Sequence, residues 1–528
     1  MIAHYTDLFS NIPNTSLVFF VIAFLAAGLS MYLFANKQTR WSLFVLFLCS
    51  LSLGFAVSTI DPFLRLWDEQ FHALVGKHLS ETPLTPRLLR EDLLSTTSNV
   101  WVNNYIWLHK QPFSLWQIAL SIKLFGANYL AVRIPSIVLH ALLVFLIYRI
   151  GKLTYNTKVG FYAAFLFTFL HYPLTLVSGA YTAEHVDVAF MFYITASIWC
   201  WLEYTKSKNV KWIWLMGLFS GIAVLSKWLV GLLVYAGVGV FMLKERSYLK
   251  SLKIWRNLVI AFLITLIIGG IWQLYCYFTY PDEFLLEMNY NALHFTSVVE
   301  GKSGGLLFYW HNLNDLYGGG LLVPWIVLAS VIMVFKTIKD KSIALFVFTL
   351  ILVPYLFFTI AQTKMPSFCV IVSPLVILVI TGFFQYLLNQ LKNKITLNVP
   401  VFISVLVVFF ISVLLFSPNK TARAHLLGSE EEKVYRKQSI KETEAIKSFD
   451  FSSYDNPVVF NTRVFKEKHK NISVMFYHDL TAYNKLGSVS EYKELIGKGY
   501  TVILLKEKKD LFSKEINDFD KIEWITVY

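Results

Sequence analysis

The sequence predicts a polytopic α-helical membrane protein, with about twelve transmembrane helices and a small soluble α/β domain at its C-terminal end. Of the 528 residues, 56% are hydrophobic and only 15% are charged, whereas a soluble protein carries about 25% charged residues. The composition changes after Ser417, where charged side chains become frequent. These observations separate a long membrane region from a short soluble one.

Apolar runs long enough to cross a hydrocarbon core of about 30 Å predict the individual membrane helices. They lie near residues 15–35, 41–60, 131–149, 158–177, 187–204, 257–278, 343–361, 366–388 and 398–416, with a shorter run near 321–335. Residues 211–243 are too long for one span and are interrupted at Ser226-Lys227-Trp228, which predicts two short helices joined by a tight turn. The first 16 residues lack the pattern of a cleaved signal peptide, so we expect the first run to be a retained span.

Basic residues in alternate short loops predict the orientation. These loops hold Lys37 and Arg40; Arg149, Lys152 and Lys158; Lys206, Lys208 and Lys211; Lys244, Arg246, Lys250, Lys253 and Arg256; Lys336, Lys339 and Lys341; and Lys392 and Lys394. The positive-inside rule places them in the cytoplasm. The loops 61–130, 178–186, 226–228, 279–320 and 362–365 and the C-terminal tail are then outside. The net charge of +13 is scattered between spans, which favours contact with anionic lipids over nucleic acid.

Three segments follow from this pattern: N-terminal transmembrane helices over residues 1–60, a membrane domain over 61–416 whose first outer loop is 61–130, and an extracytoplasmic α/β domain over 417–528. In the last segment we expect helices at Glu442–Phe449 and Val489–Gly497 and strands at Val458–Asn461, Ile472–Tyr477, Tyr500–Leu505 and Ile522–Val527. It contains neither a P-loop nor a GxGxxG motif, so no chemistry is assigned to it.

Carboxylates gather on the predicted outer side. Asp68 and Glu69 follow the second span directly, and a partly desolvated carboxylate there can act as a general base. The alternative is that Asp68 caps a helix. Asp187 heads the fifth span after Glu184 and His185, and it either caps that helix or orients the substrate sugar or the acceptor.

Basic side chains lie on the same predicted side. Lys110 stands between Trp107 and Pro112, ahead of an apolar interfacial helix at Phe113–Phe125, where its ammonium suits a lipid phosphate. Lys227 interrupts the apolar run 211–243 and Lys364 precedes Met365-Pro366, so both are expected at outer ends of short helical connections. Arg133 and Lys123 are further candidates for the same anion site. The alternative for each of these residues is a cation that snorkels to the membrane interface.

A metal centre is not indicated. His72, His109 and His185 together with the carboxylates could bind a divalent metal, but no ligand spacing favours it. The four cysteines fall in apolar runs without a CxxC, so neither a disulfide framework nor a zinc ribbon is expected. We therefore assign no metal ligand and no certain cofactor, with a divalent metal left as a possibility.

The order of several short motifs resembles the GT-C membrane glycosyltransferases, in particular the branch of the dolichyl-phosphate-mannose protein mannosyltransferases and lipid A aminoarabinose transferases. The motifs are Asp68-Glu69-Gln70-Phe71-His72-Ala73, His109-Lys110-Gln111-Pro112-Phe113-Ser114-Leu115-Trp116, Leu124-Phe125-Gly126, Arg133-Ile134-Pro135-Ser136, Asp187, Leu225-Ser226-Lys227-Trp228 and Lys364-Met365-Pro366. The resemblance runs from about residue 60 to 390. Three features depart from the pattern: Gln111 replaces a proline, Trp228 stands where a glycine is common, and an additional span precedes the first outer loop.

The resemblance implies a transferase that takes a sugar from a polyprenyl-phosphate donor and passes it to a lipid, glycan or protein. Asp68, Glu69 and Asp187 would be catalytic, and Lys110, Lys227, Lys364 and Arg133 would bind the donor phosphate. Glu184, His185 and Trp107 would contact the substrate. The expected setting is a bacterial inner membrane, with the site facing the periplasm.

The rival class is a transporter or flippase of lipid-linked sugars that performs no bond chemistry. Transporters commonly place their substrate-binding charges near the bilayer midplane, in broken helices of inverted repeats. Here the charged groups are predicted at one surface and no repeat is evident in the sequence, which favours the enzyme.

Overall fold

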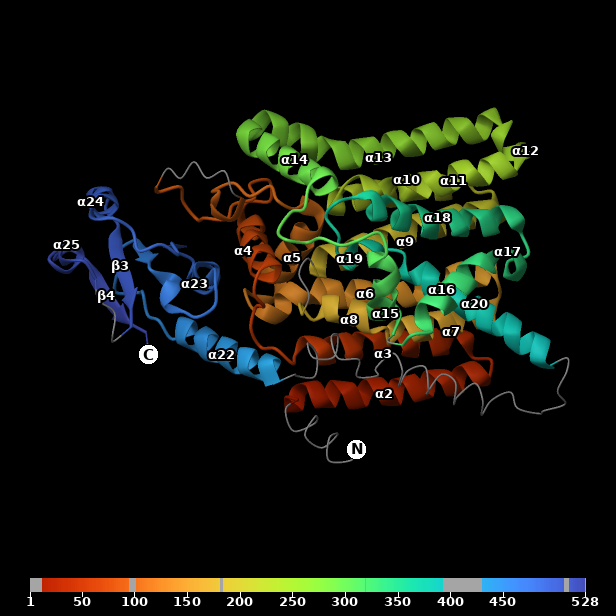
Figure 1. The fold of residues 1–528 in the computed structure, drawn as a ribbon, viewed down its shortest axis with the longest axis horizontal. Helices are drawn as coiled ribbons and strands as arrows, with labels where there is room; N and C mark the ends of the chain where they lie inside the picture. Colours follow the sequence, from red (N-terminus) through yellow and green to blue (C-terminus); the bar gives the residue numbers. More distant parts are fainter. Residues whose placement is uncertain are drawn as a thin grey trace. The chain divides into compact units, whose positions relative to one another are not determined.

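The computed structural model of the chain, which describes residues 12–94, 101–180, 184–318, 320–392, 430–507 and 512–527, divides into two compact units (Figure 1). We call Met1–Ile60 with Ser136–Gly428 the membrane unit and Asp61–Pro135 with Ser429–Tyr528 the α/β unit. This division differs from the predicted segments, because the first outer loop folds with the C-terminal segment rather than with the membrane helices. The predicted span at 398–416 and the boundary at Ser417 lie outside the described residues.

The membrane unit is helical throughout its described part. Its helices are α2 (Asn14–Ala35), α3 (Thr39–Ser58), α7 (Thr157–Thr168), α8 (His171–Val177), α9 (Glu184–Ser207), α10 (Lys211–Lys227), η2 (Leu229–Leu232), α11 (Leu233–Lys244), α12 (Arg246–Leu249), α13 (Leu252–Thr279), α14 (Pro281–Thr296), α15 (Phe308–Tyr317), α16 (Val323–Ile332), α17 (Val334–Thr337), α18 (Lys341–Ile360), α19 (Ser367–Val370) and α20 (Ser373–Lys392). Helix α6 (Tyr129–Thr154) begins in the α/β unit and continues into this one.

Seven of the described helices are long and apolar enough to cross a membrane, and an eighth span results if α7 and α8, bent by 53° at their junction, count as one. The prediction of a polytopic helical membrane protein is therefore confirmed. The predicted pair within 211–243 is present as α10, which has 17 residues, and an apolar helical segment over Leu229–Lys244. Helix α10, the segment Leu229–Lys244 and helix α16 are shorter than the seven candidate spans. The count of about twelve spans therefore stays a prediction.

Small side chains allow the first two helices to pack closely. The buried residues of α2 are Ser16, Ala23, Ala27 and Ser30. Ser30 donates a hydrogen bond to the carbonyl of Ser42 and Ser42 donates one to the carbonyl of Ser30, both at 2.8 Å. Small residues and interhelical hydrogen bonds of this kind replace the missing hydrophobic driving force between helices in lipid.

Several of the predicted cytoplasmic loops lie at the same end of the membrane unit. Figure 1 shows α12, α17 and the C-terminal end of α20 at this end. These elements adjoin or contain segments that the charge pattern predicts to be cytoplasmic, and the orientation itself stays a prediction.

The α/β unit combines a parallel sheet with several helices. From the first outer loop come α4 (Asp68–Glu81), η1 (Trp101–Asn103), α5 (Pro112–Phe125) and the start of α6, and from the C-terminal segment α22 (Glu430–Lys447), β1 (Pro457–Phe460), η4 (Thr462–Val464), α23 (Lys470–His478), β2 (Thr481–Ala482), α24 (Val489–Gly497), β3 (Thr501–Lys506), α25 (Lys514–Asn517) and β4 (Glu523–Thr526). The strand order is β2-β1-β3-β4. Val458 pairs with Thr481 on one side and Val502 on the other, and Ile503 pairs with Glu523, all in parallel.

One predicted element of this unit is wrong. Residues 472–477 were expected to form a strand and instead lie in helix α23. Ile472, Val474 and Phe476 are buried as a strand pattern requires, but Ser473 and Met475 are buried as well. A segment buried on more than one face gives no clear alternation, and a short apolar run of this kind does not distinguish helix from strand.

Candidate functional site

Helix α4 begins at Asp68, directly after a strained residue. Trp67 adopts φ 78° and ψ −124°, a conformation that costs a non-glycine residue roughly 1–3 kcal/mol. Its indole packs edge-on against the rings of Trp101 and His469, with centroid distances of 5.6 and 4.9 Å. The aromatic cluster thus holds the turn from which the Asp68 carboxylate is presented, and this carboxylate in the first turn is favoured by the helix dipole.

The carboxylate of Asp68 faces the ammonium of Lys110. The two charged atoms are 3.7 Å apart, and the side chains are 7% and 20% exposed. His109, the residue before Lys110, stacks on the indole of Trp101 with 4.0 Å between ring centroids and 6° between planes. Asp68 directly follows Trp67 and Lys110 directly follows His109, so both members of the pair are next to rings of the same aromatic cluster. The structure brings together the two residues that the sequence assigned to proton transfer and phosphate binding.

The backbone at Gln111, where the family pattern has proline, adopts a conformation that proline also takes. Gln111 adopts φ −68° and ψ 149°, which is the conformation that a proline would impose and that the following Pro112 also favours. Pro112 begins helix α5, where its missing N–H has no intrahelical partner to lose. The predicted interfacial helix is present, and Lys110 is held just before its start.

Glu69 and Arg133 bind one another rather than lining an open site. The guanidinium of Arg133 donates to both carboxylate oxygens of Glu69, at 2.6 and 2.9 Å. It also donates to the carbonyls of Asp61 and Phe63 at 2.7 and 2.8 Å. Both side chains are almost fully buried. This geometry favours a positioning role for the pair, instead of the predicted catalytic role for Glu69 and phosphate contact for Arg133.

The membrane unit holds a second carboxylate–lysine pair. The ammonium of Lys227, the last residue of α10, donates to the carboxylate of Asp187 near the start of α9. The Asp187 side chain is 0% exposed and that of Lys227 is 25% exposed. The ammonium also lies 5.4 Å from the ring centroid of Phe368, within range of a cation–π interaction. The predicted residues Asp187 and Lys227 are therefore in contact.

Trp228, which follows Lys227, occupies a conformation that suits glycine. Its φ is 70° and its ψ is −163°, so a residue with a Cβ is strained here. A glycine, which the sequence comparison with the family pattern expects here, would adopt this conformation without that strain.

Lys364 caps a helix in this structure. Its ammonium donates to the carbonyl of Thr359 at 2.9 Å and to that of Ala361. These carbonyls belong to the C-terminal end of α18, where cations are favoured by the dipole. The geometry therefore favours a capping role for Lys364 over the predicted phosphate contact.

The predicted substrate contacts are mostly buried. The indole of Trp107 is packed against Phe71, Trp101 and His109. His185 is buried in the membrane unit, where its Nδ1 lies 2.9 Å from the hydroxyl of Ser136. The side chain of Glu184 lies outside the described part of the structure. The described contacts assign packing and hydrogen-bonding roles to Trp107 and His185.

A buried charge network that the sequence did not indicate lies beside Asp68. Arg436 of α22 donates to the Asp61 carboxylate at 2.5 Å, and Arg65 donates to it at 2.7 Å. Burial by itself would raise the pKa of Asp61, but the guanidiniums of Arg65, Arg436 and Arg133 outweigh it and hold that pKa below its usual range. The i, i+4 spacing of Asp61 and Arg65 could have indicated their ion pair from the sequence. Arg436 is 375 residues away from Asp61, and no sequence pattern indicates a contact over that separation.

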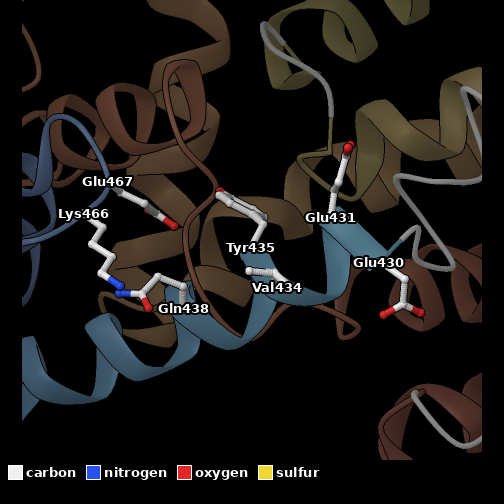
Figure 2. A pocket seen from close by; sticks show the side chains of 7 residues that line it. All are labelled: Glu430, Glu431, Val434, Tyr435, Gln438, Lys466 and Glu467. Carbon is white, nitrogen blue, oxygen red and sulfur yellow. The ribbon is translucent and has the colours of Figure 1, made fainter.

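A shallow pocket of about 530 Å³ lies on the surface of α22. Figure 2 shows the side chains that line it, which are Glu430, Glu431, Val434, Tyr435, Gln438, Lys466 and Glu467. It contains none of the predicted site residues. Within the residues that the structure describes, no group of three or more His, Cys, Asp or Glu side chains is arranged to hold a metal ion.

Comparison with known families identifies part of the chain directly. Residues 109–272 match the family described as dolichyl-phosphate-mannose-protein mannosyltransferase. An uncharacterised protein of Aquifex aeolicus is 31% identical over 183 residues, which is 35% of this chain and 36% of that protein. The undecaprenyl phosphate-alpha-4-amino-4-deoxy-L-arabinose arabinosyl transferase of Photorhabdus laumondii is 23% identical over 280 residues, 51% of this chain and 49% of that enzyme. The chain thus matches half or less of the length of these relatives.

The fold resembles solved structures over most of the chain. ArnT from Cupriavidus metallidurans, solved with undecaprenyl phosphate bound, has a TM-score of 0.60 at 16% identity and is matched over 89% of this chain and 87% of its own. The oligosaccharyltransferase AglB of Archaeoglobus fulgidus has a TM-score of 0.52 at 10% identity, over 84% of this chain and 64% of its own. These likenesses concern the fold. Together with the matched segment they confirm the resemblance expected from the motifs, which is to the GT-C membrane glycosyltransferases and, over residues 109–272, to the family of the dolichyl-phosphate-mannose-protein mannosyltransferases.

Proposed function

We propose that the chain transfers a sugar from a polyprenyl-phosphate donor to a hydroxyl group of a lipid, glycan or protein acceptor. The family match over residues 109–272 supports a glycosyl transfer, and the likeness in fold to a protein solved with undecaprenyl phosphate supports a lipid-linked donor. The observation that carries the proposal is the Asp68–Lys110 pair, a buried carboxylate facing a more exposed ammonium at 3.7 Å.

In the proposed reaction, the acceptor oxygen forms a bond to the anomeric carbon of the donor sugar. The bond between that carbon and the phosphate oxygen breaks, and its electron pair leaves with the lipid phosphate. The hydroxyl proton passes to the Asp68 carboxylate, which acts as the general base. The products are the glycosylated acceptor and free polyprenyl phosphate.

Lys110 has two successive partners in this scheme. Without donor, its ammonium is a counter-ion of Asp68. A donor phosphate carries negative charge and competes for the ammonium, which then stabilises the charge that develops on the departing phosphate. Once Lys110 has turned to the phosphate, Asp68 loses its cationic neighbour and becomes a better proton acceptor. Donor binding thereby prepares the base.

We propose a related role for the second pair. Lys227 is the more exposed member, and the ring of Phe368 and the carboxylate of Asp187 fix its ammonium. An ammonium held in this way suits a phosphate oxygen, and Asp187 is its counter-ion and a candidate for orienting a substrate hydroxyl. For Glu69, Arg133 and Lys364 we propose positioning roles instead, because each is occupied within the protein fold.

We further propose that the protein works in a bacterial inner membrane with Asp68 on the periplasmic side. The collection of basic loops at one end of the membrane unit supports this orientation. A polyprenyl donor remains in the bilayer, so an enzyme that uses it must meet it there.

The test uses the full-length protein in liposomes that contain radiolabelled undecaprenyl-phosphate-linked sugars, with lipid A, envelope glycan and envelope protein fractions as acceptors. We expect release of undecaprenyl phosphate together with label on one acceptor class, and a parallel sample with EDTA shows whether a divalent metal is needed. Movement of intact donor across the liposome membrane without release of undecaprenyl phosphate would instead establish a flippase.

A further inference from the structure

Helix α22 of the C-terminal segment holds the chain just before Asp68. The guanidinium of Arg65 donates to the carboxylate of Glu432. The hydroxyl of Tyr435 accepts a hydrogen bond from the backbone N–H of Leu66 at 3.2 Å. Arg436 donates to the Asp61 carboxylate at 2.5 Å. The three α22 residues are spaced i, i+3 and i+4, so one face of the helix makes all three contacts.

The contacts belong to a charge network with equal numbers of carboxylates and guanidiniums. It contains three carboxylates, those of Asp61, Glu69 and Glu432, and three guanidiniums, those of Arg65, Arg133 and Arg436, all of them buried. Each guanidinium donates to at least one of the carboxylates. Buried charges require such pairing, and the loss of one partner leaves an uncompensated charge.

The network continues into the turn that carries Asp68. Glu69 accepts a hydrogen bond from the backbone N–H of Arg65 at 2.6 Å. Between these two residues lie Leu66, held by Tyr435, and the strained Trp67, whose ring contacts His469 at the start of α23. Figure 2 shows Tyr435 on α22, at the edge of the surface pocket. Residues of the C-terminal segment therefore contact Arg65, Leu66 and Trp67 in succession, and the Glu69 carboxylate closes the turn by binding the Arg65 N–H.

We infer that α22 is a positioning element of the proposed site, and that Arg436, Glu432 and Tyr435 set the position of the Asp68 carboxylate relative to Lys110. The inference rests on the function proposed above and gives the C-terminal segment a role in it. None of the three residues touches the reacting atoms. They act through the turn at residues 65–69, whose displacement by a small distance misaligns the base.

The experiment compares the full-length protein with Arg436→Met and Tyr435→Phe, using Lys437→Met as the control. Lys437 is the neighbouring, exposed cation on the same helix, so its replacement removes a charge without breaking the network. Tyr435→Phe keeps the ring and removes only the hydroxyl, which accepts from the Leu66 N–H and also bonds Ser439, so we expect it to remain folded even if Arg436→Met unfolds. Two readouts are recorded: amide hydrogen exchange of residues 61–70, and steady-state turnover of the donor found active in the liposome assay.

For Arg436→Met we expect faster exchange in residues 61–70 and a loss of kcat of roughly 10–100-fold, with the KM for donor within about twofold of wild type. Tyr435→Phe shows the same signature at smaller size, Arg436→Lys restores part of the rate, and Lys437→Met behaves as wild type in both readouts. Unchanged exchange in both variants, or faster exchange with unchanged kcat, overturns the inference. If the wild-type protein turns over no donor, the proposed function fails while the exchange readout still decides whether α22 holds the turn.

Discussion

At the scale of single residues, two adjacent carboxylates of the same motif have different environments. Asp68 faces the partly exposed ammonium of Lys110, whereas Glu69 is enclosed by the guanidinium of Arg133 and a backbone N–H. Sequence reasoning assigned both to catalysis because the motif alone does not show which way each side chain points. From these contacts we propose proton transfer for the first and positioning for the second.

Replacing the proposed base tests this distinction. Asp68→Asn keeps the shape of the side chain and removes its ability to accept a proton, so turnover should fall by roughly 10²–10⁴-fold with the thermal unfolding midpoint little changed. Glu69→Gln, by contrast, leaves Arg133 with a neutral partner in a buried site and should lower the unfolding midpoint clearly. Near-normal sugar transfer by the Asp68 variant would exclude this carboxylate as the base.

Replacing the proposed phosphate ligand tests the other member of the pair. Lys110→Met retains most of the stem and loses the charge, so the barrier to transfer should rise by roughly 2.7–4 kcal/mol if the ammonium acts as an oxyanion-type donor. Lys110→Arg should recover part of the rate, because the charge survives in another geometry. Lys437→Met, at an exposed lysine of α22 to which no site role is assigned, is the control. Equal rates for Lys110→Met and the control would reduce Lys110 to an interfacial anchor.

At the scale of elements, the sequence predicts most helices and strands but not how α4 is supported. Period and length identified the spans, α5, α24, β1, β3 and β4. Residues 472–477 were misassigned because their burial depends on contacts that no local pattern encodes. They belong to α23, which packs against α4 within the same unit. The support of the site is therefore the part that sequence reasoning missed, since its members come from distant segments.

Helix α4 also carries a group that links stability to pH. Burial, with the charges of Arg87 and Lys77 nearby, lowers the pKa of His78 to about 4, although the carbonyl of Arg87, which accepts from Nδ1 at 2.8 Å, acts in the opposite direction. In the unfolded chain this histidine has a pKa of about 6.5. Between these values the unfolded state binds a proton that the folded state does not, so stability falls as the pH drops from about 6.5 to about 4.

We therefore expect the unfolding midpoint of the wild-type protein to decrease between pH 7 and pH 5, and that of His78→Asn to decrease less. The asparagine amide can still donate to the Arg87 carbonyl but does not titrate. Some dependence remains, because burial also lowers the pKa values of His469 and His478. His311→Asn, at an exposed histidine, should leave the wild-type slope unchanged. Identical slopes for His78→Asn and wild type would show that His78 titrates normally in the folded protein.

At the scale of the whole molecule, the charge pattern predicts which ends of the helices face the cytoplasm. Lys37, Arg149, Lys208, Lys250, Lys339 and Lys394 should lie inside and Asp68, Lys110 and the C-terminal Tyr528 outside, although Lys394 and Tyr528 lie beyond the described residues. The four native cysteines are buried, so cysteines introduced at exposed positions report with little background.

In intact cells whose outer membrane has been opened, an impermeant maleimide should label Lys437→Cys directly and Lys250→Cys only after the inner membrane is permeabilised. Lys437 lies on α22 and Lys250 directly follows α12. Labelling of position 250 from outside, together with protection of position 437, would show the opposite topology and contradict the periplasmic location proposed for Asp68.

The two segments of the α/β unit are synthesised at different times, which determines when the unit can fold completely. Asp61 and its partner Arg436 are separated by 375 residues. A ribosome that adds about 5–20 residues per second takes roughly 20–75 s to synthesise the stretch between them. During this interval the loop that carries Asp68 has left the ribosome, while the guanidinium and carboxylate of α22 that complete its charge network do not yet exist. A nascent chain thus passes through a stage at which its membrane helices can insert but Asp68 is not yet fixed, and synthesis of the last hundred or so residues ends that stage.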